Sequence, residues 1–257
     1  MNLSDLTKEP GQHDHFVQLY QDADVLAHAV GEYVAAGLRR GQAALIIATS
    51  AHQAEFFAAL GREGLDPGLF IKRGQLKVLD AEETLATFMA GAMPEWKSFH
   101  EVVGGLIAEL RLQYPAVRAY GEMVDVLWQR GNREAAIRLE EYWNELGRLQ
   151  TFSLFCAYHM DPLDADAYGG PLESVCKVHT HLIPTRDHAG LDAAVSAAAT
   201  KVLDQPLADI LLSLAANHRP PTQMPLGQST LMWLKQNMPR TADKVLSELR
   251  AGFSTAA

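Results

Sequence analysis

The sequence lacks the glycine-rich phosphate loop on which many nucleotide-binding α/β proteins depend. Such a loop reads G-x-x-x-x-G-K-[ST], because its glycines let backbone amides reach the phosphates and its lysine neutralises them. The stretch GQAALIIATSAHQAEF (41–56) has the order of strand, turn and helix, but no glycine or lysine lies between Gly41 and Gly61. Only the helix N-terminus and the hydroxyls of Thr49 and Ser50 are left to hold an anion, which argues against ATP hydrolysis.

Other enzyme signatures are missing as well. The chain contains no G-x-S-x-G elbow, H-E-x-x-H helix, G-x-G-x-x-G turn or C-x-x-C pair. We therefore expect no enzymatic activity, and we assign no catalytic residue and no cofactor.

Cysteines and long apolar runs are scarce. The two cysteines, Cys156 and Cys176, do not form the pattern of a disulfide framework. No apolar run reaches the roughly 18 residues that a membrane span requires. The opening MNLSDLTKEPGQHDHF is polar and has no hydrophobic signal-peptide centre. We therefore expect a cytoplasmic protein with reduced thiols and no membrane association.

Positive charge is in short supply. The formal net charge is −9, so the surface as a whole should repel nucleic acid, and we expect no nucleic-acid partner. The negative charge is unevenly distributed along the chain, because the residues from 206 onward carry five basic and three acidic side chains. This shift supports a separate C-terminal module. The 257 residues, 48% of them hydrophobic, suffice for one large core and an appendage.

Short apolar segments alternate with amphipathic helical patterns along the first two thirds of the chain. Strands are predicted at 42–49, 75–81, 116–123 and 151–158. Helices are predicted at 22–41, 50–64, 80–93 and 131–150. Ser50 is the expected N-cap of the second helix, and Asp80 should begin the third. Continuous apolar strands between helices indicate a three-layer α/β fold, with a mostly parallel sheet and helices on both faces.

The last third of the chain has a different pattern. A turn-rich break at 161–175 precedes a last short helix and the segment HTHLIP, and helical segments follow at 190–203, 206–218, 229–238 and 239–253. We divide the chain into an N-terminal tail (1–12), an α/β domain (13–185) and a helical C-terminal extension (186–257). Exposed apolar helices in the extension lead us to expect a homo-oligomer.

Six motifs, read in order, resemble the MEDS family, the sensory domain named after methanogens, methylotrophs and a dichloromethane-responsive regulator. They are HDHFVQLYQDADVL, IATSAHQAEF, RGQLKVLDAEETLATFM, RAYGEMVDVLWQRGN, RLEEYWNEL and SLFCAY. The resemblance covers roughly residues 13–183. It implies a RecA-like fold with a degenerate P-loop that has lost nucleotide hydrolysis. It also implies a sensor of small organic compounds, found in transcription regulators, beside histidine kinases, or alone.

The family pattern falls on named positions of this chain. Residues that match its motifs are His15, Tyr20, Glu122, Glu141, Asn144, Cys156, His179 and His181. Two departures matter. No kinase core or helix-turn-helix accompanies these motifs, so an output domain is missing, and the tail after about residue 190 has no counterpart in the family.

A ligand is expected at the carboxyl ends of the strands, where open α/β sheets bind their ligands. Thr49, Asp80 and Glu122 should lie along this rim. Glu122 can accept hydrogen bonds from a ligand or act as a base, but it can also cap the following helix or pair with Arg118. Further candidates for ligand contact, from the family pattern and from residue type, are His15, Tyr20, Asn144 and His179.

The histidines and cysteines raise the question of a metal. Cys156 and His159 form C-x-x-H, and a C-x-x-H-x-H pattern begins at Cys176. Thiolate and imidazole are preferred zinc ligands, but residues three apart on a strand point to opposite faces. We therefore predict no metal site. Two ligand sets stay open as alternatives: Cys156, Cys176, His179 and His181, or His15, Glu122 and His179.

The leading hypothesis is a non-catalytic cytoplasmic sensor that acts in signal transduction and transcription regulation. An unknown small molecule would bind the degenerate nucleotide-type pocket and favour one arrangement of the domain and its tail. The signal would pass through the tail or to a partner, such as a regulator or a histidine kinase. Two alternatives remain: an adaptor or anti-regulator with a vestigial pocket, which acts by protein–protein interaction, and a residual nucleotide-binding enzyme.

Overall fold

The chain divides into two compact units. A computed structural model describes residues 3–161, 163, 167–183, 188–217 and 222–254. The units are Met1–His159 and Met160–Ala257, so the short helix α10 (Pro171–Lys177) belongs to the second. The boundary after residue 185, which the sequence suggested for the sensory domain, stays a prediction.

A parallel sheet forms the centre of the first unit. Its strands are β1 (His15–Tyr20), β2 (Ala43–Ala48), β3 (Leu76–Asp80), β6 (Val117–Gly121) and β7 (Ser153–His159). In space they follow the order β3-β2-β6-β7-β1, and every pairing is parallel. Apolar side chains on both faces of these strands are buried, as in a sheet covered by helices on each side.

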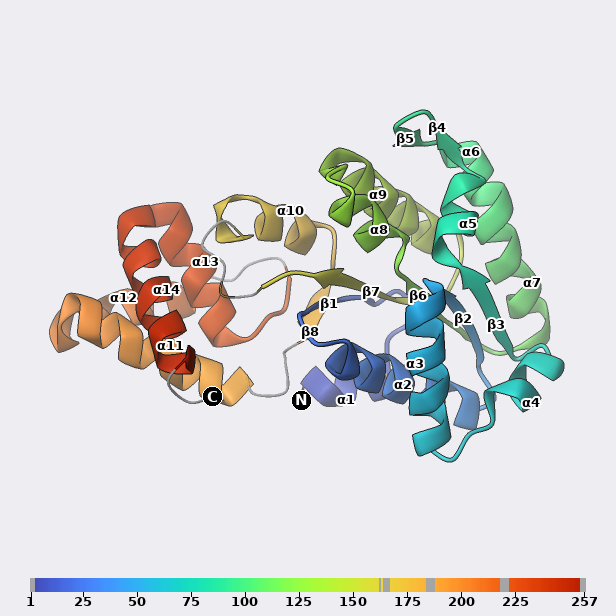
Figure 1. The fold of residues 1–257 in the computed structure, drawn as a ribbon, viewed down its shortest axis with the longest axis horizontal. Coiled ribbons are helices and arrows are strands. Elements are labelled where there is room, and N and C mark those ends of the chain that lie inside the picture. The colour runs from blue at the N-terminus through green and yellow to red at the C-terminus, as the bar shows by residue number, and fades with distance from the viewer. Residues whose placement is uncertain (1–2, 162, 164–166, 184–187, 218–221, 255–257) are drawn as a thin grey trace. The chain divides into compact units, whose positions relative to one another are not determined.

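Helices cover both faces of this sheet (Figure 1). One face carries α2 (Ala23–Arg39) and α3 (Ser50–Arg62), where Tyr33 meets Phe155 edge to face. The other face carries α7 (Gly105–Gln113) and α9 (Arg133–Leu149), where Trp143 packs against Gly121. The predicted three-layer α/β class is therefore confirmed. The remaining helical segments of this unit are α1 (Leu3–Lys8), α4 (Pro67–Lys72), α5 (Ala81–Ala86), α6 (Trp96–Phe99), the π-helical η1 (His100–Gly104) and α8 (Met123–Gln129).

The helix predicted over 80–93 is shorter than expected. It begins where predicted, because Asp80 caps α5, but it ends at Ala86. The hairpin of β4 (Met89–Ala90) and β5 (Met93–Pro94) follows. Its turn contains Gly91 at φ 63°, a left-handed conformation that glycine adopts without steric cost. The N-cap of α3 is also one residue earlier than predicted, at Thr49 instead of Ser50.

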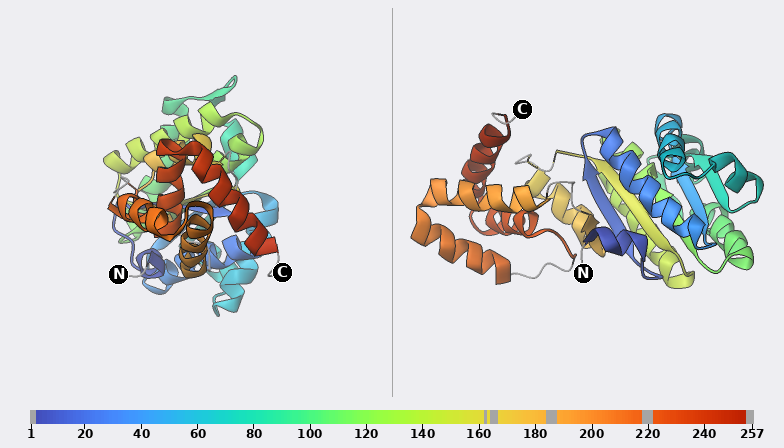
Figure 2. Two further views of the ribbon diagram at one scale, coloured as in Figure 1. Left: turned by 90° about the vertical axis from the view of Figure 1, so that its left-hand side faces the viewer. Right: turned by 90° about the horizontal axis from the view of Figure 1, so that it is seen from below.

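The second unit is mainly helical. It contains η2 (Ala167–Gly169), α10, β8 (His181–Ile183), α11 (His188–Leu203), α12 (Gln205–Asn217), α13 (Leu226–Asn237) and α14 (Pro239–Ser254). The helices α11 to α14 pack on one another, as Figure 2 shows, around buried residues such as Leu231, Leu234 and Val245. The predicted C-terminal helices are therefore confirmed. Among the described helices, none has both the length and the apolar character needed to cross a lipid bilayer.

Candidate functional site

Glu122 and Thr49 meet at the carboxyl ends of the strands. Glu122 directly follows β6, and the residue is 3% exposed. It accepts hydrogen bonds from the Thr49 backbone amide (3.1 Å) and from the Thr49 hydroxyl (3.2 Å). Its side chain does not cap α8, and the Arg118 guanidinium bonds instead to Gln42 and to backbone carbonyls. Glu122 is thus the N-cap residue of α8, as considered, although its side chain makes no capping hydrogen bond, and the pairing with Arg118 is wrong.

His52 completes this contact, although it was not among the predicted site residues. Its Nδ1 lies 2.7 Å from Glu122 Oε1, and the hydrogen bond to Glu122 raises the pKa of His52 above its ordinary value of 6.5. Its position in the sequence could have indicated this role, because His52 falls in the first turn of α3, close to the predicted Thr49. The three residues form a compact polar cluster between the β2–α3 and β6–α8 turns.

Tyr20 belongs to the same edge through another missed residue, Asp125. The Tyr20 hydroxyl donates to Asp125 Oδ2 (3.1 Å), and Asp125 Oδ1 accepts from the His159 backbone amide (3.1 Å). Burial raises the pKa of Asp125, and burial together with the Asp125 charge raises the pKa of Tyr20. The ring centroid of Tyr20 lies 5.8 Å from that of His52 and 5.4 Å from that of His159.

Asp80 is on this edge too, but its carboxylate serves the helix that follows. It accepts from the Glu82 and Glu83 amides (2.8 and 3.0 Å) and from the Ser50 hydroxyl (3.1 Å). The Glu83 amide contributes most to lowering the pKa of Asp80. The predicted rim residues Thr49, Asp80 and Glu122 thus bond to the protein itself.

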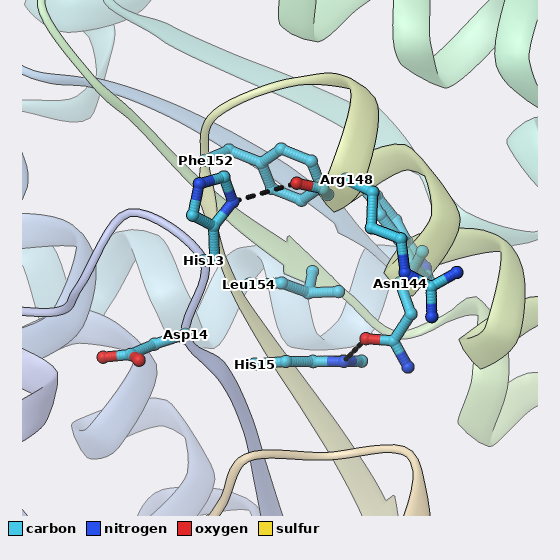
Figure 3. Close-up of a pocket in the computed structure, with 9 residues that line it drawn as sticks. His13, Asp14, His15, Asn144, Arg148, Phe152 and Leu154 are labelled. Carbon is cyan, nitrogen blue, oxygen red and sulfur yellow. Dashed lines mark hydrogen bonds between the residues drawn. The ribbon is translucent and has the colours of Figure 1, made fainter.

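A cavity of about 430 Å³ lies at the opposite edge of the sheet, where β1 and β7 begin. The two strands are parallel neighbours, so their amino ends meet beside the last turns of α9. Figure 3 shows the side chains around this cavity. The residues that line it are His13, Asp14, His15, Trp143, Asn144, Gly147, Arg148, Phe152 and Leu154.

The cavity combines an apolar wall with a polar one. Trp143, Phe152 and Leu154 are buried and supply the apolar surface. Asn144 and Arg148 are one helical turn apart on α9 and therefore project from the same face of the helix. Arg148 is exposed, so this side offers an amide and a cation to an occupant.

His15 connects the cavity to a buried polar network. Its Nδ1 hydrogen-bonds to Asn144 Oδ1 (2.9 Å), as Figure 3 shows. Its Nε2 lies 3.3 Å from Cys156 Sγ and 3.3 Å from Glu140 Oε2. Cys156 and Glu140 are fully buried, and the Tyr158 hydroxyl donates to Glu140 Oε1 (2.8 Å). The structure thus brings together two predicted residues, His15 and Asn144.

Strand and helix periodicity explain this network. Alternation along β1 and β7 turns His15 and Cys156 toward α9, while Glu140 and Asn144 lie one helical turn apart there. The family motif had suggested Glu141, which instead forms a surface ion pair with Arg138 (2.8 Å). Glu140 was missed, although its spacing from the buried Ala136, Leu139 and Trp143 puts it on the inward face of α9.

Cys156, His15 and Asn144 are arranged in the order of a cysteine nucleophile, its base and an orienting amide. A nucleophilic cysteine acts as the thiolate. Here burial, followed by the Glu140 carboxylate, raises the pKa of the Cys156 thiol well above its ordinary value. The Sγ–Oε2 distance to Glu140 is 3.4 Å. These surroundings oppose thiolate formation and hence nucleophilic catalysis.

The other predicted ligands of the alternative metal set lie in the second unit. Cys176 is buried, His179 Nδ1 bonds to the Val175 carbonyl (2.6 Å), and His181 Nδ1 lies 2.7 Å from the Thr180 hydroxyl. In the first unit, Cys156 turns toward Glu140 and the His159 ring lies against Tyr20, as strand alternation requires.

The sequence was also compared with known proteins. A family model described as "MEDS: MEthanogen/methylotroph, DcmR Sensory domain" matches residues 14–180. A search of curated proteins finds no match to the chain. The matched range begins one residue before β1 and contains the whole sheet of the first unit.

Proposed function

The chain belongs to this family of sensory domains, and we propose that it senses a small organic molecule bound in the cavity beside β1, β7 and α9. One observation carries the proposal. His15 lines the cavity and also contacts the buried Cys156 and Glu140. An occupant that competes for the Asn144–His15 hydrogen bond therefore acts directly on the core of the unit.

The lining of the cavity defines the class of ligand. A flat apolar body fits against Trp143, Phe152 and Leu154, and an anionic or acceptor group faces the Asn144 amide and Arg148. The volume falls within the range of about 300–1,000 Å³ that is usual for small-molecule sites. Small aromatic carboxylates combine these features and are the probes we would use first.

The carboxyl edge of the sheet has a different role in this proposal. We regard the Thr49–His52 turn as the degenerate phosphate loop of a RecA-like domain. The support is that Glu122 accepts a hydrogen bond from the Thr49 amide, so a resident carboxylate takes a donor that an anion would need. A second negative group would be repelled there. The proposed sensor is therefore non-catalytic.

Signalling follows from differential affinity. A ligand shifts a conformational equilibrium only by the difference in its affinity for the two states. In this proposal the change in conformation is transmitted by the helices α11 to α14 or to a cytoplasmic partner, such as a transcription regulator or a histidine kinase.

The test is binding of benzoate to the full-length chain, measured by saturation-transfer NMR. Gly147→Leu places a side chain at the cavity, where a Cβ lies 4.0 Å from Phe152 Cζ. Gly105→Leu is the matched control, because a Cβ at that exposed helical glycine meets nothing within 4 Å. We expect saturation transfer in the wild type and the control, and its loss in Gly147→Leu. Equal transfer in both variants, or none in the wild type, would contradict the proposal.

A further inference from the structure

We propose that His15, Glu140 and Cys156 bind a zinc ion in the core of the first unit. The three residues come from β1, α9 and β7, and all of them are buried. Imidazole nitrogen, carboxylate oxygen and cysteine sulfur are the donor atoms that zinc takes in proteins. The site lies inside the sheet–helix layer and is distinct from the organic-ligand cavity, with which it shares only the His15 ring.

The distances between the donor atoms match a zinc tetrahedron. The three edges are 3.3 Å (Nε2–Sγ), 3.3 Å (Nε2–Oε2) and 3.4 Å (Sγ–Oε2). Zinc bonds of about 2.0–2.3 Å at tetrahedral angles hold their donors about 3.3–3.7 Å apart. A charge-assisted N–H···O bond would be shorter, at about 2.7–2.9 Å. The atoms are thus arranged around a common centre, where His15, Glu140 and Cys156 can all reach one ion.

The surrounding hydrogen bonds aim the donors at this centre. Asn144 Oδ1 accepts from His15 Nδ1, which leaves the lone pair of Nε2 directed at Cys156 and Glu140. The Tyr158 hydroxyl donates to Glu140 Oε1, so that Oε2 faces the other two ligands. Histidine and carboxylate ligands of metals are usually held by such outer partners.

The charges of the ligands agree with the proposed zinc site. Burying a carboxylate and a thiolate together is costly in a medium of low dielectric, and a divalent cation between them offsets that cost. His15 also lines the cavity, so a metal ion that enters from the cavity would have to pass its ring. A fourth donor, from water or from the protein, would complete the tetrahedron.

The first experiment measures zinc content and the spectrum of the cobalt-substituted protein, using the full-length chain. We expect one zinc per chain and, with cobalt, the intense visible bands of a tetrahedral site together with thiolate-to-cobalt charge transfer. Cys176→Ser should keep the charge-transfer band, because Cys156 is then the only thiol left. Cys156→Ser should lose it. A chain that binds no zinc, or a Cys176→Ser protein without the band, would overturn the proposal.

The second experiment compares two neighbouring glutamates by competition with a zinc-chelating dye. Glu140→Gln keeps the shape of the buried side chain and should release zinc, whereas exposed Glu141→Gln should retain it. Asn144→Ala should weaken zinc binding about 10–100-fold, as loss of an outer partner does. Unchanged affinity in Glu140→Gln would mean adventitious binding and would refute the site. Zinc binding does not depend on benzoate binding, so either proposal can fail alone.

Discussion

Polar side chains bond to one another at both edges of the sheet, and a cavity adjoins the amino edge. At the carboxyl edge, Glu122 bonds to Thr49 and His52, and Tyr20 bonds to Asp125. At the amino edge, Asn144 and His15 bond to each other beside a cavity. The rim residues therefore lie where expected, but their polar atoms form hydrogen bonds within the protein.

His52 provides a pH-dependent contribution to stability. Because its pKa in the folded state is raised by Glu122, the contribution is complete below the ordinary pKa of 6.5 and is lost as the pH rises through the folded value. We expect the free energy of unfolding of the wild type to exceed that of His52→Gln most near pH 6, with the difference shrinking at higher pH. Urea denaturation at several pH values measures this difference. Glu122→Gln is the control and should abolish the trend; a difference that grows with pH would contradict the account.

Two glycines near the Trp143–Phe152 region respond oppositely to alanine. At Gly121 a Cβ would lie 3.2 Å from the Trp143 ring, so Gly121→Ala should destabilise the protein by about 1–3 kcal/mol. At Gly147 it would lie 4.0 Å from Phe152, and Gly147→Ala should stabilise by about 0.4–1 kcal/mol. Chemical denaturation gives both values, and the same sign for both variants would show that the packing around Trp143 is misassigned.

At the scale of elements, the continuous apolar strands could be predicted from sequence, because parallel strands that are buried on both faces contain few polar residues. Strand β1 was harder to recognise, since His15 and Gln18 interrupt its apolar character although both are buried. The β4–β5 hairpin was missed because its residues continue a helical pattern that only the Gly91 turn interrupts.

The candidate site could likewise be predicted only in part from the sequence. Sequence motifs indicated His15 and Asn144, and the structure brings them together. The position of the cavity could not be predicted, because it depends on how the end of α9 meets the first residues of β1 and β7. Glu140 and Glu141 are adjacent in sequence, and only the rotation of α9 decides that Glu140 faces the core.

Helix α1 is attached to the first unit by a buried arginine. Arg118 donates to the carbonyls of Thr7 (2.9 Å) and Lys8 (2.9 Å) in α1, and to the carbonyl of Tyr33 (2.8 Å) in α2. Arg118→Met should destabilise the unit by at least about 2 kcal/mol, because it removes the hydrogen bonds that a buried guanidinium donates to three backbone carbonyls. It should also speed hydrogen exchange in α1. Exposed Arg62→Met is the control, with an expected change within about 0.5 kcal/mol; unchanged exchange in Arg118→Met would refute the anchoring role.

At the scale of the whole molecule, the family match and the compact units do not end at the same residue. The match runs to residue 180, whereas the first unit ends at His159. The cavity residues and the proposed zinc ligands all lie within the first unit. In our proposal this unit receives the signal and the helices of the second unit pass it on.

The most direct test of the sensor proposal is an amide NMR titration of the full-length chain with benzoate. The account predicts that chemical-shift changes concentrate at residues 13–15, 143–148 and 152–154, around the cavity at the amino edge. Amides at 49–52, 80–83 and 122–125 should shift little. Changes concentrated at this carboxyl edge, with the cavity amides unaffected, would contradict it.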